Sequence, residues 1–388
     1  MLIREHHAVP LVAIDLWIRA GSSSETEEEH GAAHFLEHLI FKGTPTRKPG
    51  EIDTAFEDLG ATLSAGTTRD AAHFYATVSS AHVADALPVL ADAIMHPLLD
   101  PQEVERERGV ILDELARSSN DVRKEVLDRL FATLFPGTPY ASPVLGTPQA
   151  IRTVTRAAIL RFYGRWYHPN NATLVFCGDI TPDAAEALAA KCFGSWKQME
   201  VPALPAVTAQ PRSQAVSAQS SNAPAIAALG FPCPPATDVE SAAAMEIFAR
   251  AATLHQGLDR FPGQASAINV TFISLRQASL LALDAPPEGS RGLPALWDWL
   301  RSCIDKMTDE DVETARRELL GEYLYQIETE GGMAAALGRF DTLGDYRQLA
   351  RYTEKLQTIP PTEVRAAARR LLTPARAVQI VMEPPSKP

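Results

Sequence analysis

The sequence predicts an α+β chain of two related domains. Strand-like and helix-like segments follow one another without strict alternation, which favours α+β over a wholly parallel α/β sheet. With 388 residues, the chain is too long for one ordinary core and suits two domains of roughly 150–200 residues each. A segment rich in Pro, Ala, Ser and Gln runs from Met199 to Pro224 without helical periodicity. We therefore expect a first domain over residues 1–200, a linker over 201–223 and a second domain over 224–388.

The composition argues against several classes of function. Hydrophobic residues make up 46% of the chain and charged residues 22%, as in globular proteins. The net charge is −12 and the longest basic clusters are pairs such as Arg316-Arg317, so neither nucleic acid nor an anionic membrane is expected as a partner. No apolar run approaches the roughly 18–20 residues that span a bilayer. The four cysteines are scattered, which indicates neither a disulfide framework nor a cysteine metal site.

The N-terminal residues carry no secretory signal. Met1 to Arg4 lead directly to His6-His7 and a strand-like run. The sequence as given therefore predicts a cytoplasmic location, or a periplasmic one if the N-terminus is a trimmed form. The His6-His7 pair is either a surface tract or a weak, adventitious metal site.

In the first domain, apolar periodicity and turn residues predict each element in order. Strands are expected over Leu11–Ala20, Gly60–Thr68, His73–Val78 and Leu174–Gly178. Helices are expected over Ala32–Phe41, Glu51–Leu59, Ala81–Met95, Glu103–Arg117 and from Pro182 onward. The turn residues Gly43-Thr44-Pro45 end the first of these helices.

The second domain repeats this order in outline. Strands are expected over Ile226–Phe231, Ile268–Ser274, Ser279–Leu283 and Ala377–Met382. Helices are expected over Val239–Thr253, Leu293–Met307, Asp309–Thr329 and Pro361–Leu372. The two halves are compatible with a diverged duplication, although no repeat is visible at the level of residues.

The strongest chemical signal is the run His34-Phe35-Leu36-Glu37-His38. On a helix, residues four apart lie one turn apart on the same face, so both imidazoles can reach one metal ion. Glu37 lies just to one side of that face, where a general base can hold a water molecule. This is the H-x-x-E-H order, the reverse of the commoner metalloprotease motif. The alternative is two surface histidines on an amphipathic helix.

A catalytic zinc needs a third protein ligand and an open position. The predicted helix Glu103–Arg117 contains Glu107 and Glu114, which are seven residues apart and so nearly on one face after two turns. One carboxylate can bind the metal while the other hydrogen-bonds a ligand. The alternative is a solvated acidic face. For His73 and His168 we expect structural hydrogen bonds.

These residues occur in a pattern that resembles a known family. The run His34–His38 is followed by Phe41-Lys42-Gly43-Thr44, by the segment Glu105–Glu114 and by Pro143-Val144-Leu145-Gly146-Thr147. Tyr167-His168-Pro169-Asn170-Asn171 and Gly178-Asp179 complete the likeness. It resembles the M16 (pitrilysin) family of inverzincin metallopeptidases, of the M16B, mitochondrial-processing-peptidase-like type with a LuxS/MPP-like fold. The resemblance implies one zinc per chain on His34, His38 and Glu114, with Glu37 as the base and Glu107 as a supporting residue.

The resemblance also suggests how substrate is bound. Arg339 and Tyr346 match a pair that, in the family, reaches from the non-zinc half towards the substrate carbonyl, where donors stabilise a developing oxyanion. The alternative is an exposed Arg and a packed Tyr. Ser64-Ala65 stands where the family usually has Asn-Ala in the substrate-binding strand. The segment Thr253–Gly263 replaces the family's usual Gly-rich segment, and an expected leading strand looks shortened or lost.

The resemblance thus implies a zinc-dependent endopeptidase that cuts extended, unfolded peptides inside a dimeric clamshell chamber. Two identical chains, or this chain and another M16 subunit, would form that chamber. One alternative is a dedicated processing peptidase for a single precursor. A second alternative is a non-catalytic, structural partner subunit, although chains of that sort typically lose the zinc residues that this chain retains.

Overall fold

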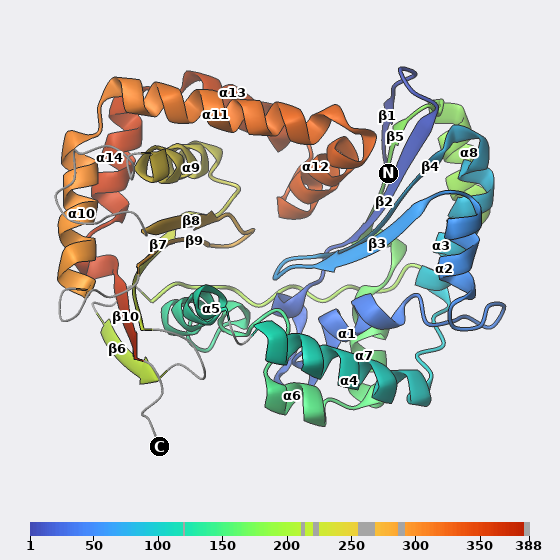
Figure 1. The fold of residues 1–388 in the computed structure, drawn as a ribbon. Coiled ribbons are helices and arrows are strands. Elements are labelled where there is room, and N and C mark those ends of the chain that lie inside the picture. Colours follow the sequence, from blue (N-terminus) through green and yellow to red (C-terminus); the bar gives the residue numbers. More distant parts are fainter. Residues whose placement is uncertain (119–120, 211–213, 220–224, 255–267, 286–291, 384–388) are drawn as a thin grey trace. The chain divides into compact units, whose positions relative to one another are not determined.

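The computed structural model describes residues 1–118, 121–210, 214–219, 225–254, 268–285 and 292–383 (Figure 1). These residues form helices and two five-stranded sheets, which confirms the α+β prediction. Among them, no helix is long and apolar enough to cross a membrane. Contacts divide the chain into a first unit, residues 1–115, 142–205 and 325–347, and a second unit, residues 116–141, 206–324 and 348–388.

The sheet of the first unit has the order β1-β5-β2-β4-β3. Its strands are β1 (Leu2–Glu5), β2 (Leu11–Ile18), β3 (Thr62–Thr67), β4 (Ala72–Ser79) and β5 (Ala172–Gly178). β1 pairs with β5 in parallel, and the other pairs are antiparallel. Every residue of β2 after Leu11 is buried, as expected for a central strand covered on both faces.

Helices cover both faces of this sheet. They are α1 (Ala32–Leu39), α2 (Glu51–Asp58), α3 (Val83–Met95), α4 (Pro101–Ser118), α6 (Pro148–Thr153), α7 (Arg156–Trp166), α8 (Pro182–Phe193) and α12 (Glu330–Leu343). Phe35 and Leu36 of α1 pack with Ile14 of β2 and Phe74 of β4 in the main core. On the opposite face, α12 lies against β2 and β5.

The second unit has the equivalent sheet order, β6-β10-β7-β9-β8. Its strands are β6 (Gln214–Gln219), β7 (Ile226–Cys233), β8 (Asn269–Ile273), β9 (Ser279–Ala285) and β10 (Val378–Glu383). Its helices are α5 (Val122–Leu134), α9 (Val239–Leu254), α10 (Gly292–Lys306), α11 (Asp309–Glu328), α13 (Gln348–Thr358) and α14 (Pro361–Leu371). As in the first sheet, the first strand of the unit pairs in parallel with the last.

The two units also share a repeat at the level of residues. In the first, Arg108 pairs with Glu105 and donates to the carbonyl oxygen of Ile151. In the second, Arg316 pairs with Glu313 and donates to the carbonyl oxygen of Ile359. The residues Glu105, Arg108 and Ile151 of the first unit thus correspond to Glu313, Arg316 and Ile359 of the second, and the same number of residues separates the members of each pair. The shared topology and this shared contact support the duplication that the sequence left open.

The leading strand is shortened and not lost, since β1 has four residues and pairs with β5 along its whole length. Other expectations from the sequence need correction. The expected linker contains β6, which pairs with β10. The units are not contiguous domains, because residues 116–141 group with the second unit and residues 325–347 with the first. Most of the segment Thr253–Gly263 lies outside the described residues.

The packing of α12 on β2 depends on a residue without a side chain. A Cβ atom on Gly338 would lie 2.1 Å from Nε1 of Trp17, which is itself buried. We therefore expect Gly338→Ala to lower the free energy of unfolding by about 1–3 kcal/mol, because the indole must shift in a filled core.

Gly164 of α7 is the matched control, since a Cβ there meets nothing within 4 Å. Gly164→Ala should be neutral or should stabilise by up to about 1 kcal/mol through helix propensity. Urea unfolding followed by circular dichroism measures both variants. Equal stabilities of the two variants would contradict the proposed packing.

Candidate metal centre

The helix that carries the H-x-x-E-H motif begins at a glycine. Gly31 has φ +93°, a conformation that side-chain-bearing residues rarely adopt, and a Cβ there would lie 2.4 Å from Cδ1 of Ile151 in α6. The glycine therefore permits both the turn into α1 and its close approach to α6. His34 and His38 then lie one turn apart on α1.

A buried carboxylate replaces the usual side-chain cap of α1. Gly31 makes no side-chain cap bond, and instead Glu25 accepts hydrogen bonds from the backbone N–H of Gly31 at 3.0 Å and of Ala33 at 2.8 Å. These bonds satisfy two donors that a helix N-terminus leaves unpaired. Burial raises the pKa of Glu25 to about 8, against the opposing effect of the two N–H donors. The sequence analysis did not identify Glu25, because its partners lie six and eight residues further along the chain.

The structure brings His34, His38 and Glu114 together. Oε2 of Glu114 lies 3.6 Å from Nε2 of His34 and 3.7 Å from Nε2 of His38. One ligand atom from each of the three residues lies within 4.8 Å of the others. Two ligands about 2.0–2.1 Å from a tetrahedral zinc ion stand about 3.3–3.4 Å apart, so the observed spacing needs only a small adjustment.

The donor set and its exposure also fit zinc. Two imidazole nitrogens and one carboxylate oxygen leave one position of a tetrahedral site for water or substrate. His34 is buried, whereas the side chain of Glu114 is 38% exposed. The group is therefore open on the Glu114 side. In the described parts of the chain, it is the one group of three or more potential ligands with this spacing.

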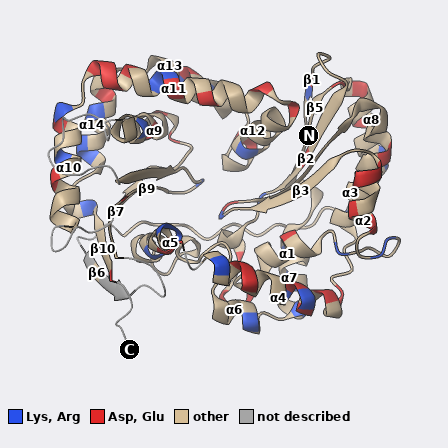
Figure 2. Ribbon diagram, in the orientation of Figure 1, with Lys and Arg blue, Asp and Glu red and all other residues tan. Residues whose placement is uncertain are grey.

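Glu107 orients one of the imidazoles. Its Oε2 lies 3.0 Å from Nδ1 of His38, and its Oε1 lies 3.1 Å from Nζ of Lys42. Glu107 is buried, and Lys42 compensates its negative charge. Donation of the Nδ1 hydrogen of His38 to Glu107 leaves Nε2 available to a metal. Figure 2 shows acidic and basic residues mixed along α4. Of these, Glu107 contacts Nδ1 of His38, and Glu114 lies beside Nε2 of the same imidazole.

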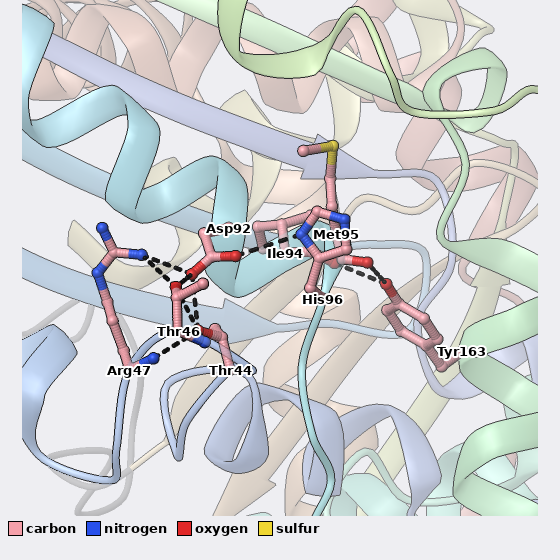
Figure 3. A network of polar contacts seen from close by, with 8 residues as sticks. All are labelled: Thr44, Thr46, Arg47, Asp92, Ile94, Met95, His96 and Tyr163. Carbon is pink, nitrogen blue, oxygen red and sulfur yellow. Dashed lines mark hydrogen bonds and ion pairs between the residues drawn. The ribbon is translucent and has the colours of Figure 1, made fainter.

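The loop after α1, which carries Lys42, is bound to α3 through one carboxylate. Asp92 accepts hydrogen bonds from Oγ1 of Thr44 at 2.6 Å, Oγ1 of Thr46 at 2.7 Å and the guanidinium of Arg47 at 2.5 Å (Figure 3). Burial opposes ionisation of Asp92, but these donors outweigh it and lower its pKa. Nearby, the hydroxyl of Tyr163 donates to backbone carbonyls at the end of α3. The network fixes the loop that presents Lys42 to Glu107.

Glu37 is the residue for which the sequence predicts the role of general base. It lies on α1 between the two histidines and is partly exposed. Within the part of the chain that the structure describes, its carboxylate has no hydrogen-bonding or ion-pairing partner. It is therefore able to accept a hydrogen bond from water.

The residues expected to bind substrate fall into two places. Ser64 and Ala65 lie on β3, the edge strand of the first sheet, where Ser64 is exposed and Ala65 packs against the core (Figure 1). Arg339 is exposed on α12, and Tyr346 follows that helix with the guanidinium of Arg347 5.0 Å from its ring centroid. Among the described residues, neither Arg339 nor Tyr346 bonds to the histidine cluster. Both belong to the first unit, whereas the sequence placed them in the second domain.

The remaining histidines make hydrogen bonds of the kind expected. Nε2 of His168 lies 2.7 Å from the carbonyl oxygen of Gly164, and Nδ1 of His73 lies 3.2 Å from Oδ1 of Asp15. His6 pairs with the buried Glu330, and His7 with Asp179 and Glu5. The His6-His7 pair is thus engaged by carboxylates in the structure.

The contacts of Glu107 lead to a prediction about metal affinity. Glu107→Gln should weaken zinc binding about 10–100-fold, the usual effect of losing the partner that orients a metal-binding histidine. Lys42→Met should weaken it less, because His38 keeps its acceptor. Competition with a chromophoric chelator measures both values.

Glu105→Gln is the matched control, because Glu105 lies on the same helix but is exposed and pairs with Arg108. Its zinc affinity should equal that of the wild type. If Glu105→Gln and Glu107→Gln lost affinity equally, Glu107 would have no specific part in orienting His38.

Two family models match consecutive segments of the chain. The family model "Insulinase (Peptidase family M16)" matches residues 1–148, and "Peptidase M16 inactive domain" matches residues 153–251. An uncharacterized zinc protease of Mycobacterium bovis is 28% identical over 94% of this chain and 87% of its own length. The mitochondrial-processing peptidase subunit beta of Bos taurus is 35% identical over 52% of this chain and 42% of its own length.

The fold is also that of a solved structure. A protease from Helicobacter pylori superposes with a TM-score of 0.88 at 20% identity, covering 98% of this chain and 97% of that one. This likeness shows the fold alone. The two M16 models match consecutive segments that together make up more than half of the residues, and the chain belongs to the M16 peptidase family.

Proposed function

We propose that this chain is a zinc-dependent endopeptidase that hydrolyses extended, unfolded peptides. The observation that carries the proposal is that His34, His38 and Glu114 lie close enough together to bind one metal ion. The unpaired carboxylate of Glu37 lies on α1, the helix that also carries the two histidines. The family, and a relative named as a zinc protease, support the same chemistry. Because all three candidate ligands are retained, this chain is a better candidate for an enzyme than for a non-catalytic partner subunit.

His34, His38 and Glu114 would hold the zinc, which when bound would activate water and polarise a peptide carbonyl. Glu37 would accept a proton from the attacking water at a carboxylate oxygen and then pass it to the leaving amine. Glu107 would keep His38 in the tautomer whose Nε2 faces the metal. Lys42 would hold Glu107 in place.

The substrate would add to the sheet as a further strand. β3 is the edge strand, and its outer backbone groups are the natural partners of an extended peptide. Such pairing selects an extended conformation more than a sequence, which favours unfolded peptides. Ser64 would lie on the exposed face of this pair, with a shorter reach than the Asn usual in the family.

Two chains would together form the working enzyme. The curated relative from Bos taurus is named as a subunit, which supports assembly with a second M16 chain. In a homodimer, Arg339 and Tyr346 of one chain would act on the carbonyl of a peptide held by the zinc site of its partner. The same relative makes a dedicated processing peptidase the second candidate function.

The roles of ligand and base can be separated by mutation. Glu37→Gln should keep about one zinc per chain but lower turnover of a peptide mixture by several orders of magnitude, because the water loses its proton acceptor. Glu114→Ala should lose the metal itself. Zinc content by mass spectrometry and peptide cleavage by chromatography measure the two effects.

A chelator should abolish cleavage by the wild type, and added zinc should restore it. A folded protein that contains a cleavable segment should be spared. Peptide hydrolysis that continued unchanged after removal of zinc would overturn the proposal.

The homodimer makes a complementation prediction. Glu37→Gln chains and Arg339→Ala/Tyr346→Phe chains should each be inactive, whereas a freely exchanging mixture should regain about a quarter of wild-type activity. About half of the dimers would be mixed, and each would contain one site with both an intact base and an intact Arg/Tyr pair. Peptide cleavage after mixing measures this. No recovery despite proven subunit exchange would contradict action in trans and favour a separate partner subunit.

A further inference from the structure

A group of polar and aromatic side chains around His73 lies beside the edge strand β3, on the sheet face opposite α1. Nδ1 of His73 on β4 lies 3.2 Å from Oδ1 of Asp15 on β2, and Asp15 is only 2% exposed. The imidazole is stacked between two rings, with centroid distances of 4.1 Å to Trp17 and 4.8 Å to Tyr75. The hydrogen bond and the two stacking contacts fix the orientation of this histidine.

The other ring nitrogen of His73, Nε2, lies beside Gly66 of β3, a residue without a side chain. In the sheet register, His73 pairs with Gly66 of β3. A Cβ atom on Gly66 would lie 2.9 Å from Nε2 of His73. The imidazole thus occupies the space that a side chain of the edge strand would otherwise fill. Nε2 has no hydrogen-bonding partner among the described residues, and the side chain is 18% exposed.

We propose that Nε2 of His73 is a specificity-determining contact for one side chain of a peptide paired with β3. Side chains directly opposite each other on neighbouring strands have Cβ atoms about 4.5–5.5 Å apart. Since Nε2 lies 2.9 Å from the point where a Cβ of residue 66 would stand, a peptide residue paired with Gly66 on this face needs a side chain long enough to cross that position, such as glutamine. This inference rests on the proposed binding of peptides at β3.

The Asp15–His73 pair determines which side chains are accepted. We take the Nδ1 hydrogen to be donated to the buried Asp15, which would leave Nε2 as an acceptor. The contact therefore selects a side chain with a hydrogen-bond donor, such as an amide, hydroxyl or ammonium group, and rejects a carboxylate. α12 lies mainly against β2 and β5, and the side chain of His73 remains 18% exposed.

Glutamine and glutamate peptides test this selection, because the two side chains have nearly the same shape. Binding is measured by fluorescence anisotropy with zinc-loaded Glu37→Gln protein, so that no peptide is consumed. In a series of labelled peptides, one glutamine at a time is replaced by glutamate. We expect one position at which glutamate weakens binding about tenfold. In a second background carrying His73→Phe, which keeps a stacked ring but has no nitrogen, the difference should disappear.

Two further variants make the result independent of folding defects. His73→Phe leaves Asp15 without its donor, so Asp15→Asn/His73→Phe is tested alongside it, with melting curves for both. His168→Phe removes a histidine whose side chain contacts the carbonyl oxygen of Gly164 in α7, and it should keep the wild-type selection.

Equal binding of all glutamine and glutamate peptides, a preference for glutamate, or no peptide binding at all would overturn the inference. Zinc-dependent cleavage by the wild type is measured separately. Cleavage without the glutamine preference would contradict the His73 contact alone. The preference without any cleavage would contradict the proposed enzymatic function and leave the contact standing.

Discussion

The carboxylate of Glu107 joins the two helices on which the candidate metal site depends. It extends from α4 and contacts both His38 of α1 and Lys42 in the loop after α1. A buried carboxylate is costly unless it is paired, and these two partners satisfy both of its oxygens. With α4 held in this way, Glu114 lies two turns further along the same face and reaches His34 and His38. The ligand geometry therefore follows from one buried ion pair and from helical periodicity.

The electrostatics of this region favour a divalent cation. Glu37, Glu107 and Glu114 lie around two histidines, and Lys42 balances one of the three carboxylates. Burial raises the pKa of the thiols of Cys177, Cys233 and Cys303 to about 12 and also raises that of Cys192. The candidate group found among the described residues offers two nitrogen donors and one oxygen donor.

The sequence predicted those parts of the site that depend on local spacing. The four-residue spacing of His34 and His38, and the seven-residue spacing of Glu107 and Glu114, place each pair on one helix face in the structure. Contacts between distant segments could not be read in this way. Glu25 caps a helix through a backbone N–H six residues later, and Asp92 binds a loop more than forty residues earlier. β1 pairs in parallel with β5, the last strand of its sheet in sequence. The place of α12 was missed for the same reason, since its partners β2 and β5 lie far from it in sequence.

The duplication shows how one half came to differ from the other. α9 follows the central strand β7 as α1 follows β2, but its sequence contains no histidine. The Arg108 and Arg316 contacts persist in both halves, which indicates that the scaffold is retained where the metal donors are not. We therefore expect the first unit alone to hold zinc, through two imidazoles and one carboxylate. X-ray absorption spectroscopy of the zinc-loaded protein tests this directly. We predict only nitrogen and oxygen neighbours at about 2.0–2.2 Å, with the outer-shell scattering of two imidazoles. Sulfur neighbours at about 2.3 Å, or scattering from fewer than two imidazoles, would contradict it.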